Sequence, residues 1–133
     1  MELVKVVARF VDGRLIKGFT QDFHPNRAHF HLHSAADSSG KPIEIFIKEL
    51  KAVFFVKDFV GDSSYNERKD YTDGAKPQGR KMEVMFKDGE VLVGSSLGYD
   101  PKRLGFFLFP ADPASNNLRI FAVVAAVKNV RFL

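Results

Sequence analysis

The sequence of 133 residues contains no cysteine. It therefore excludes disulfide bonds, a thiolate nucleophile, and zinc or iron–sulfur sites built on cysteine. Long apolar runs are also lacking, because the longest, which ends at Val127, is far shorter than the roughly 20 residues that span a bilayer. The opening segment MELVKVVARF has neither the long apolar stretch nor the small-residue cleavage site of a signal peptide. We expect a cytoplasmic protein without membrane contacts.

Charge of one sign is not concentrated anywhere in the chain. The 20 basic and 16 acidic residues give a net charge of +4, which permits contact with phosphates but does not demand it. Between Lys57 and Lys81 the two signs are interleaved, as is typical of a solvated linker. A phosphate-binding loop and a dinucleotide-binding fingerprint are both lacking. We therefore expect no enzymatic activity, no catalytic residues and no cofactor.

The most informative pattern that is present is an internal repeat. When the two Asp-Gly pairs are aligned, identical residues recur at a constant spacing of 76 positions. The identical pairs are Phe10/Phe86, Asp12/Asp88, Gly13/Gly89, Gly18/Gly94, Pro25/Pro101, Arg27/Arg103, Phe30/Phe106 and Leu32/Leu108. Further on, LKAVFFV (Leu50–Val56) aligns with VKNVRFL (Val127–Leu133) after one extra residue in the second copy. Chance similarity rarely keeps glycine, proline and phenylalanine aligned over such a length, so we infer two related units.

Each unit is predicted to form five short β-strands. Apolar and polar residues alternate through Val4–Phe10 and through Met82–Phe86, as they do in strands with one buried face. The Asp-Gly pairs supply hairpin turns, whereas Gly18 and Gly94 fall inside the second strand, where glycine usually marks a bend or a close backbone approach. The pattern predicts an all-β fold of two tandem small five-stranded barrels of the Sm or SH3 kind, related by the internal repeat.

The repeat divides the chain into three parts. We expect the first barrel at residues 1–59, a polar linker at residues 60–79 and the second barrel at residues 80–133. A unit of about 55 residues is marginally stable alone. The two units are therefore expected to pack together and to share apolar surface.

The spacing of Gly89, Gly94 and GYD (Gly98–Asp100) resembles the first motif of Sm-like proteins. That motif has a turn glycine, a second glycine five residues later, and an aromatic-Asp pair before a third strand. The resemblance implies the small barrel. It does not imply the family's RNA site, because Ala28 and Leu104 lie near the position of the Met-Asn pair that contacts RNA bases in Sm proteins. The Arg-Gly pair of the second Sm motif is also missing.

A second resemblance covers nearly the whole chain. The segments LKAVFFVKDF (Leu50–Phe59) and GFFLFPADPASNNLRIF (Gly105–Phe121) are similar to an uncharacterised bacterial domain family. Its members occur alone or attached to signalling modules, including PilZ-type domains. PilZ domains bind cyclic di-GMP through an arginine-rich motif and an Asp/Asn-x-Ser-x-x-Gly motif, and neither is recognisable here. The resemblance therefore implies a regulatory role without a particular ligand.

Three histidines at alternate positions, His29, His31 and His33, would face the same side of a strand. Two histidines at this spacing can share a zinc ion, so His29 and His31 are the candidate metal ligands, with further ligands that the sequence does not identify. A pH-sensitive interface and an ordinary strand surface are the alternatives. The counterparts in the second unit are a glycine and two phenylalanines, which favours the ordinary surface. We therefore expect no bound metal.

The adjacent rings in Phe54-Phe55 and Phe106-Phe107 lie on opposite faces of a strand. One ring of each pair therefore needs cover from the other unit, another chain or a partner. The resulting interface candidates are Phe54, Phe55, Phe59, Phe107 and Phe109. The candidates for phosphate contacts are Lys102 and Arg103.

These patterns predict a non-enzymatic binding module that acts through protein contacts in bacterial signalling. Its partner would be another protein or a second copy of the chain in a homodimer. The alternative is an Sm-like RNA-binding protein, which the glycine–aromatic–Asp spacing and the positive net charge favour.

Overall fold

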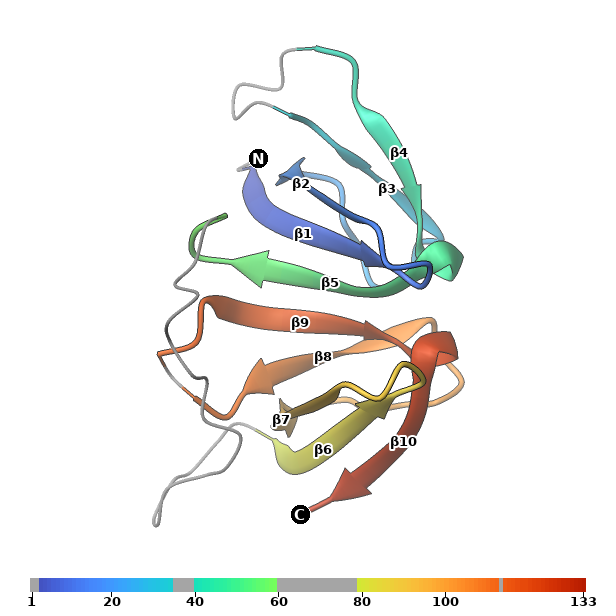
Figure 1. Ribbon diagram of the computed structural model, residues 1–133, viewed down its shortest axis with the longest axis vertical. Coiled ribbons are helices and arrows are strands. Elements are labelled where there is room, and N and C mark those ends of the chain that lie inside the picture. The colour runs from blue at the N-terminus through green and yellow to red at the C-terminus, as the bar shows by residue number, and fades with distance from the viewer. Residues whose placement is uncertain (1–2, 35–39, 60–78, 113) are drawn as a thin grey trace.

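The structure is a computed structural model that describes residues 3–34, 40–59, 79–112 and 114–133 (Figure 1). The described chain forms ten strands. They are β1 (Val4–Phe10), β2 (Leu15–Thr20), β3 (His29–Leu32), β4 (Ile43–Phe46), β5 (Leu50–Val56), β6 (Arg80–Phe86), β7 (Val91–Ser96), β8 (Gly105–Pro110), β9 (Asn117–Val123) and β10 (Val127–Phe132). Two short 3₁₀ helices, η1 (Ile47–Glu49) and η2 (Val124–Ala126), precede β5 and β10. The all-β class is confirmed, and none of the helices in these ranges could cross a membrane.

The strands form an eight-stranded antiparallel sheet in the order β10-β6-β7-β8-β9-β5-β1-β2 and a two-stranded sheet, β3-β4. A bridge between Phe19 and His33 connects β2 to β3. In both repeats the strands therefore follow the same spatial order: fifth, first, second, third, fourth. Figure 1 shows the first repeat, in blue to green, above the second repeat, in yellow to red.

The pairing register is the same in the two repeats. Val6 lies opposite Phe55 in the first repeat, and Met82 lies opposite Phe132 at the equivalent place in the second. Equivalent pairs of the third and fourth strands are His29/Phe46 and Gly105/Val123, Phe30/Ile45 and Phe106/Ala122, and His31/Glu44 and Phe107/Phe121. A register shift interrupts the pairing of the first with the fifth strand in both repeats. The structure thus repeats as the sequence does.

Strand β5 of the first repeat and β9 of the second join the two repeats. They pair antiparallel, with Ala52 opposite Ala122 and Phe54 opposite Ile120. The result is one open sheet that runs through both repeats, whereas the sequence predicted two tandem barrels packed against each other. The physical reason lies in β5, because every one of its residues is buried. A strand that is apolar on both faces is stable only inside a sheet that is covered on both sides.

Each repeat has its own hydrophobic core, and the joining strands contribute to both cores. Val53 and Phe55 of β5 belong to the first core, whereas Phe54 belongs to the second. In return, Phe121 and Val123 of β9 belong to the first core. The second repeat therefore provides the cover that the sequence required for Phe54.

Glycines at equivalent positions permit the tight turns and the close approach of neighbouring strands. In the Asp-Gly turns, φ is +96° at Gly13 and +95° at Gly89, a conformation that glycine adopts without strain. A Cβ atom on Gly18 would collide with the carbonyl oxygen of His33, just after β3, and one on Gly94 would collide with that of Phe109 on β8. The predicted close backbone approach is confirmed. The predicted linker, residues 60–79, lies outside the described residues except for Gly79.

Candidate functional site

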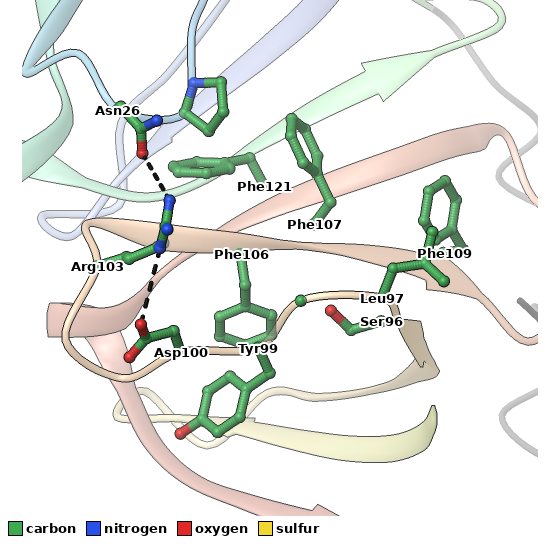
Figure 2. A pocket seen from close by; sticks show the side chains of 13 residues that line it. Asn26, Ser96, Leu97, Tyr99, Asp100, Arg103, Phe106, Phe107, Phe109 and Phe121 are labelled. Carbon is green, nitrogen blue, oxygen red and sulfur yellow. Dashed lines mark hydrogen bonds and ion pairs between the residues drawn. The ribbon is translucent and has the colours of Figure 1, made fainter. Parts of the chain in front are cut away.

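A pocket of about 450 Å³ lies where the two repeats meet (Figure 2). The loop between β2 and β3 contributes Pro25 and Asn26, and the equivalent loop between β7 and β8 contributes residues 97–100 and Arg103. Strands β7, β8 and β9 complete the lining with Ser96, Gly105, Phe106, Phe107, Phe109 and Phe121. The pocket therefore combines corresponding loops of both repeats.

Five aromatic side chains contribute to the pocket wall. The rings of Tyr99 and Phe106 meet edge to face with centroids 4.8 Å apart, and those of Phe107 and Phe121 do so at 5.3 Å. Phe109 continues the wall along β8. Rings that pack edge to face hold one another in place, so the wall is a preformed apolar surface of the kind that binds ligands.

The polar rim of the pocket is built around Arg103. Its Nη1 donates to Oδ1 of Asn26 at 3.2 Å, and its Nε lies 3.7 Å from Oδ2 of Asp100. The backbone N–H of Lys102 donates to Oδ1 of Asp100 at 2.9 Å, and Lys102 is exposed. The two candidates for phosphate contacts thus lie beside the pocket, with Asp100 balancing the charge of Arg103.

Ser96, at the end of β7, also lines the pocket. Its hydroxyl oxygen is buried and has no hydrogen-bond partner among the described residues. The segment Gly94–Gly98 has the Gly-x-Ser-x-Gly spacing of hydrolase nucleophile elbows, a signal for Ser96 that our sequence prediction omitted. An elbow joins a strand to a helix, whereas β7 runs into a loop. Ser96 is therefore a buried polar group of the pocket, and its geometry is not that of an elbow nucleophile.

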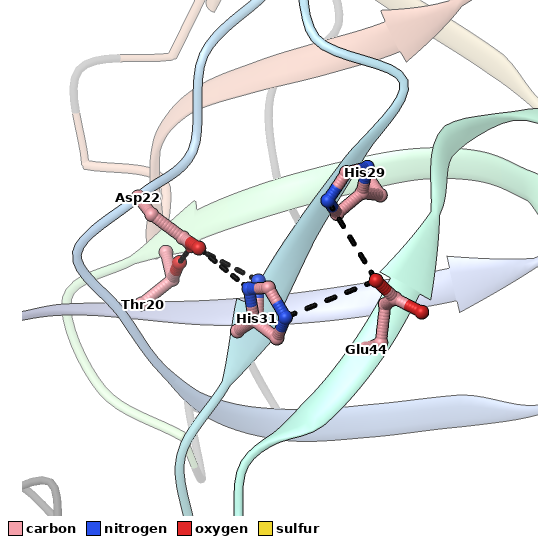
Figure 3. A network of polar contacts seen from close by, with 5 residues as sticks. All are labelled: Thr20, Asp22, His29, His31 and Glu44. Carbon is pink, nitrogen blue, oxygen red and sulfur yellow. Dashed lines mark hydrogen bonds and ion pairs between the residues drawn. The ribbon is translucent and has the colours of Figure 1, made fainter.

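A polar network surrounds the histidines of β3 (Figure 3). Nδ1 of His31 lies 2.7 Å from Oδ2 of Asp22, and the backbone N–H of His31 donates to Oδ1 of Asp22 at 2.9 Å. From β4, Oε2 of Glu44 lies 3.6 Å from Nε2 of His29 and 3.9 Å from Nε2 of His31. Partial burial by itself raises the pKa of Asp22, but hydrogen bonds from His31 and Thr20 outweigh it and hold that pKa below its ordinary value.

The two candidate metal ligands thus have carboxylate partners from neighbouring segments. The rings of His29 and His31 are 5.7 Å apart, while His33 forms the bridge to Phe19. Within the described ranges, no group of three or more histidine, aspartate and glutamate side chains is arranged to hold a metal ion. That the protein binds no metal stays a prediction.

The profile of a family of unknown function, DUF6982, matches residues 3–133. The chain belongs to this family. No curated protein and no solved structure matches the chain. The predicted relationship to an uncharacterised domain family is thereby confirmed. The function of this DUF6982 member has to be inferred from the chemistry of its site.

The interface candidates of this DUF6982 member lie in three different places. Phe107 and Phe109 line the pocket. Phe54 and Phe55 are buried where the repeats join. Phe59 packs edge-on against Phe19, with ring centroids 5.3 Å apart. The structure therefore brings two of the five candidates to the pocket.

One cation near the aromatic wall was not predicted from the sequence. The guanidinium of Arg119, on β9, lies 4.5 Å from the ring centroid of Phe55 and 4.4 Å from that of Phe107. Desolvation by burial lowers the pKa of Arg119. Arg119 stands two residues before Phe121 in the sequence, and this spacing places both on the same face of β9.

Proposed function

We propose that the chain is a non-enzymatic binding module that works through protein contacts, with the pocket between the repeats as its site. The observation that carries this proposal is the composition of the pocket, an aromatic wall beside an arginine. Aromatic residues, phenylalanine among them, and arginine are enriched at protein interfaces. Asp100 balances the charge of Arg103, which suits a protein ligand better than a polyanion.

The chemistry of the pocket defines the ligand. The partly exposed rings of Phe107 and Phe109 offer a site for one apolar anchor side chain. The side chain of Arg103 is 60% exposed, so an acidic residue of the ligand can reach it. We therefore propose a protein segment with an apolar residue close to an acidic one.

We further propose that each repeat is one Sm-like unit and that the chain serves bacterial signalling. The common strand order of the two repeats and the spacing of Gly89, Gly94 and Asp100 support the first part. The similarity of Leu50–Phe59 and Gly105–Phe121 to domains that occur with signalling modules supports the second.

Binding of single-stranded nucleic acid is a second candidate function. Exposed Lys102 and Arg103 lie beside the aromatic wall. Proteins that bind single strands combine cations for the phosphates with rings on which the bases stack. Asn26 and Asp100 already contact the guanidinium of Arg103, and Asp100 offsets its charge. Because this disfavours a run of phosphates more than a single carboxylate, we rank the protein ligand first.

Peptides selected from a displayed random library against the wild-type protein test the first proposal. We expect a selected peptide to bind in titration calorimetry, and Arg103→Glu to weaken it by about tenfold or more, since like charges then face each other. Lys5→Glu makes the same charge change at an exposed residue of β1 outside the pocket, and it should leave the affinity unchanged. Peptides that bind the Arg103→Glu variant equally well contradict the proposal.

Titration of single-stranded RNA of mixed sequence tests the second candidate. Phosphate contacts make affinity fall steeply between about 50 and 200 mM salt. Tight, salt-sensitive binding that is lost in Lys102→Ala and Arg103→Ala would defeat the protein-ligand proposal. RNA binding that is weak at both salt concentrations would leave the peptide result to stand.

A further inference from the structure

The second repeat has an open groove at a place where the first repeat is filled. This groove has a volume of about 300 Å³ and runs beside β10. Its lining combines Pro101, Lys128 and Asn129 with the apolar or aromatic residues Tyr99, Phe106, Val124, Val127 and Val130. Tyr99 and Phe106 also border the aromatic pocket, but the groove lies along the outer edge of the sheet. At that edge, β10 pairs only with β6 in the described chain.

The first repeat contains the same groove in an occupied form. The counterparts of the five apolar or aromatic lining residues are Phe23, Phe30, Ile47, Leu50 and Val53. These residues pack in the first core together with Phe121 and Val123, which β9 supplies. The ring of Phe23 lies 5.1 Å from that of Phe121. The open groove of the second repeat is therefore equivalent to a groove in the first repeat that Phe121 and Val123 of β9 fill.

The strand that corresponds to β9 in the first repeat is β4, and its outer side has no partner strand among the described residues. The sequence alignment sets Ile43, Glu44 and Phe46 of β4 at the positions of Ile120, Phe121 and Val123 of β9. Ile43 is 47% exposed and Phe46 is 38% exposed. Within the described residues, the molecule thus presents an unpaired, partly apolar edge at β4 and an unfilled groove beside β10. Figure 1 shows these two strands at opposite ends of the molecule.

We infer that copies of this chain bind head to tail, with β10 of one copy adding to β4 of the next in the register that β5 adopts on β9. In that register Val130 lies opposite Glu44, Asn129 lies opposite Ile45, and Phe46 enters the groove. One end of the molecule fits the other end and does not fit itself. Such a heterologous contact closes into a ring or continues as a filament.

Charged residues make the contact between copies weaker than the contact between repeats. Lys51 forms ion pairs with Asp88 and Glu90 across the repeats. The counterparts of these three residues are Lys128, Asp12 and Arg14. In the contact between copies, Lys128 would attract Asp12 as Lys51 attracts Asp88. It would be repelled by Arg14, which stands in the place of Glu90. Glu44 also stands where β9 has a phenylalanine, and desolvating its carboxylate costs free energy. The assembly therefore depends on protein concentration.

Sedimentation velocity of the full chain over a range of concentrations tests this inference. We expect the mass of the wild-type protein to rise above that of one chain as concentration increases. Phe46→Asp on β4 and Val130→Glu on β10 should each keep the protein a monomer, the second because the introduced carboxylate would face that of Glu44. Leu118→Asp, at a 57% exposed residue of β9 away from both edges, should assemble as the wild type does. Circular dichroism establishes that each variant is folded.

A mixture of the two edge variants decides the geometry. Each variant retains one intact edge, so an equimolar mixture should form a complex of two chains and nothing larger. A wild-type protein that stays monomeric at every concentration would overturn the inference, as would a mixture that stays monomeric. Assembly that persists in folded Phe46→Asp protein would also overturn it, because a different surface would then be responsible.

Discussion

A Cβ atom on Gly94 would overlap the carbonyl oxygen of Phe109, because the backbones of the paired strands β7 and β8 approach closely there. Gly94→Ala should therefore force the strands apart and lower the free energy of unfolding by about 3 kcal/mol. Gly98→Ala is the matched control, since nothing lies within 4 Å of a Cβ at that position, and its effect should stay within about 0.5 kcal/mol. Urea denaturation measures both. Equal midpoints for the two variants would contradict the close approach of β7 and β8 at Gly94.

The exchange of core residues between the repeats predicts that they unfold together. Phe54 belongs to the first repeat by sequence but to the second core by contact. We expect Phe54→Ala to lower the free energy of unfolding by about 3–5 kcal/mol and to leave one cooperative transition in calorimetry. Leu118→Ala, at an exposed site, should have little effect. Two separate transitions in the variant would show that the repeats are independent.

A fragment of residues 1–59 tests the same dependence in another way. It lacks Phe121 and Val123, which complete the first core, so it should show no cooperative thermal transition by circular dichroism. Adding the fragment 79–133, which supplies β9, should restore one. A fragment 1–59 that melts cooperatively alone would mean that β9 is dispensable for the first repeat.

Much of each repeat could be predicted because its signals are local. The alternation through Val4–Phe10 marks a strand, and the Asp-Gly pair at residues 12–13 marks the turn that follows it. Gly18 marked a close approach, although the sequence did not name its neighbour. Because the same signals recur at a constant spacing in the second repeat, each inference could be drawn from both copies. This is why the strand positions agree with the structure.

Contacts between segments far apart in the sequence could not be predicted because they depend on the tertiary arrangement. The apolar run around Phe54 required cover, but only the pairing of β5 with β9 decides what covers it. Asn26 and Arg103 meet across the pocket although they belong to different repeats. Glu44 reaches His31 through the register of β3 and β4. Such a register is set by the whole sheet, and no short motif encodes it.

The lowered pKa of Asp22 predicts a pH dependence of stability. Its carboxylate stabilises the fold fully above the ordinary aspartate pKa of about 3.9, and this contribution is lost as the pH falls through the lowered folded-state pKa. Asp22→Asn should therefore lower the free energy of unfolding more at about pH 6 than at about pH 2, where more of the carboxylate is protonated. Urea denaturation at both pH values gives the comparison. The same loss at both would mean that the Asp22 charge is not what His31 and Thr20 stabilise.

Lys51 is a cation inside the joint between the repeats, with only 5% of its side chain exposed. Its Nζ lies 2.7 Å from Oδ2 of Asp88, pairs with Glu90 as well, and stands 4.9 Å from the centroid of the Phe86 ring. No pattern in the sequence indicated this burial, because a lysine before an apolar run is ordinarily solvated.

Because Lys51 is buried, removing the charges of its two acidic partners should destabilise the protein more than removing Lys51 itself. Asp88→Asn with Glu90→Gln leaves a buried ammonium without a countercharge, which should cost about 3–5 kcal/mol of unfolding free energy. Lys51→Met removes the buried charge itself, while Asp88 and Glu90 keep access to water through side chains that are 55% and 34% exposed. It should therefore cost less than the double variant. Urea denaturation of the two proteins gives the order, and a larger loss in Lys51→Met would mean that Lys51 acts through packing of its aliphatic stem and not through its charge.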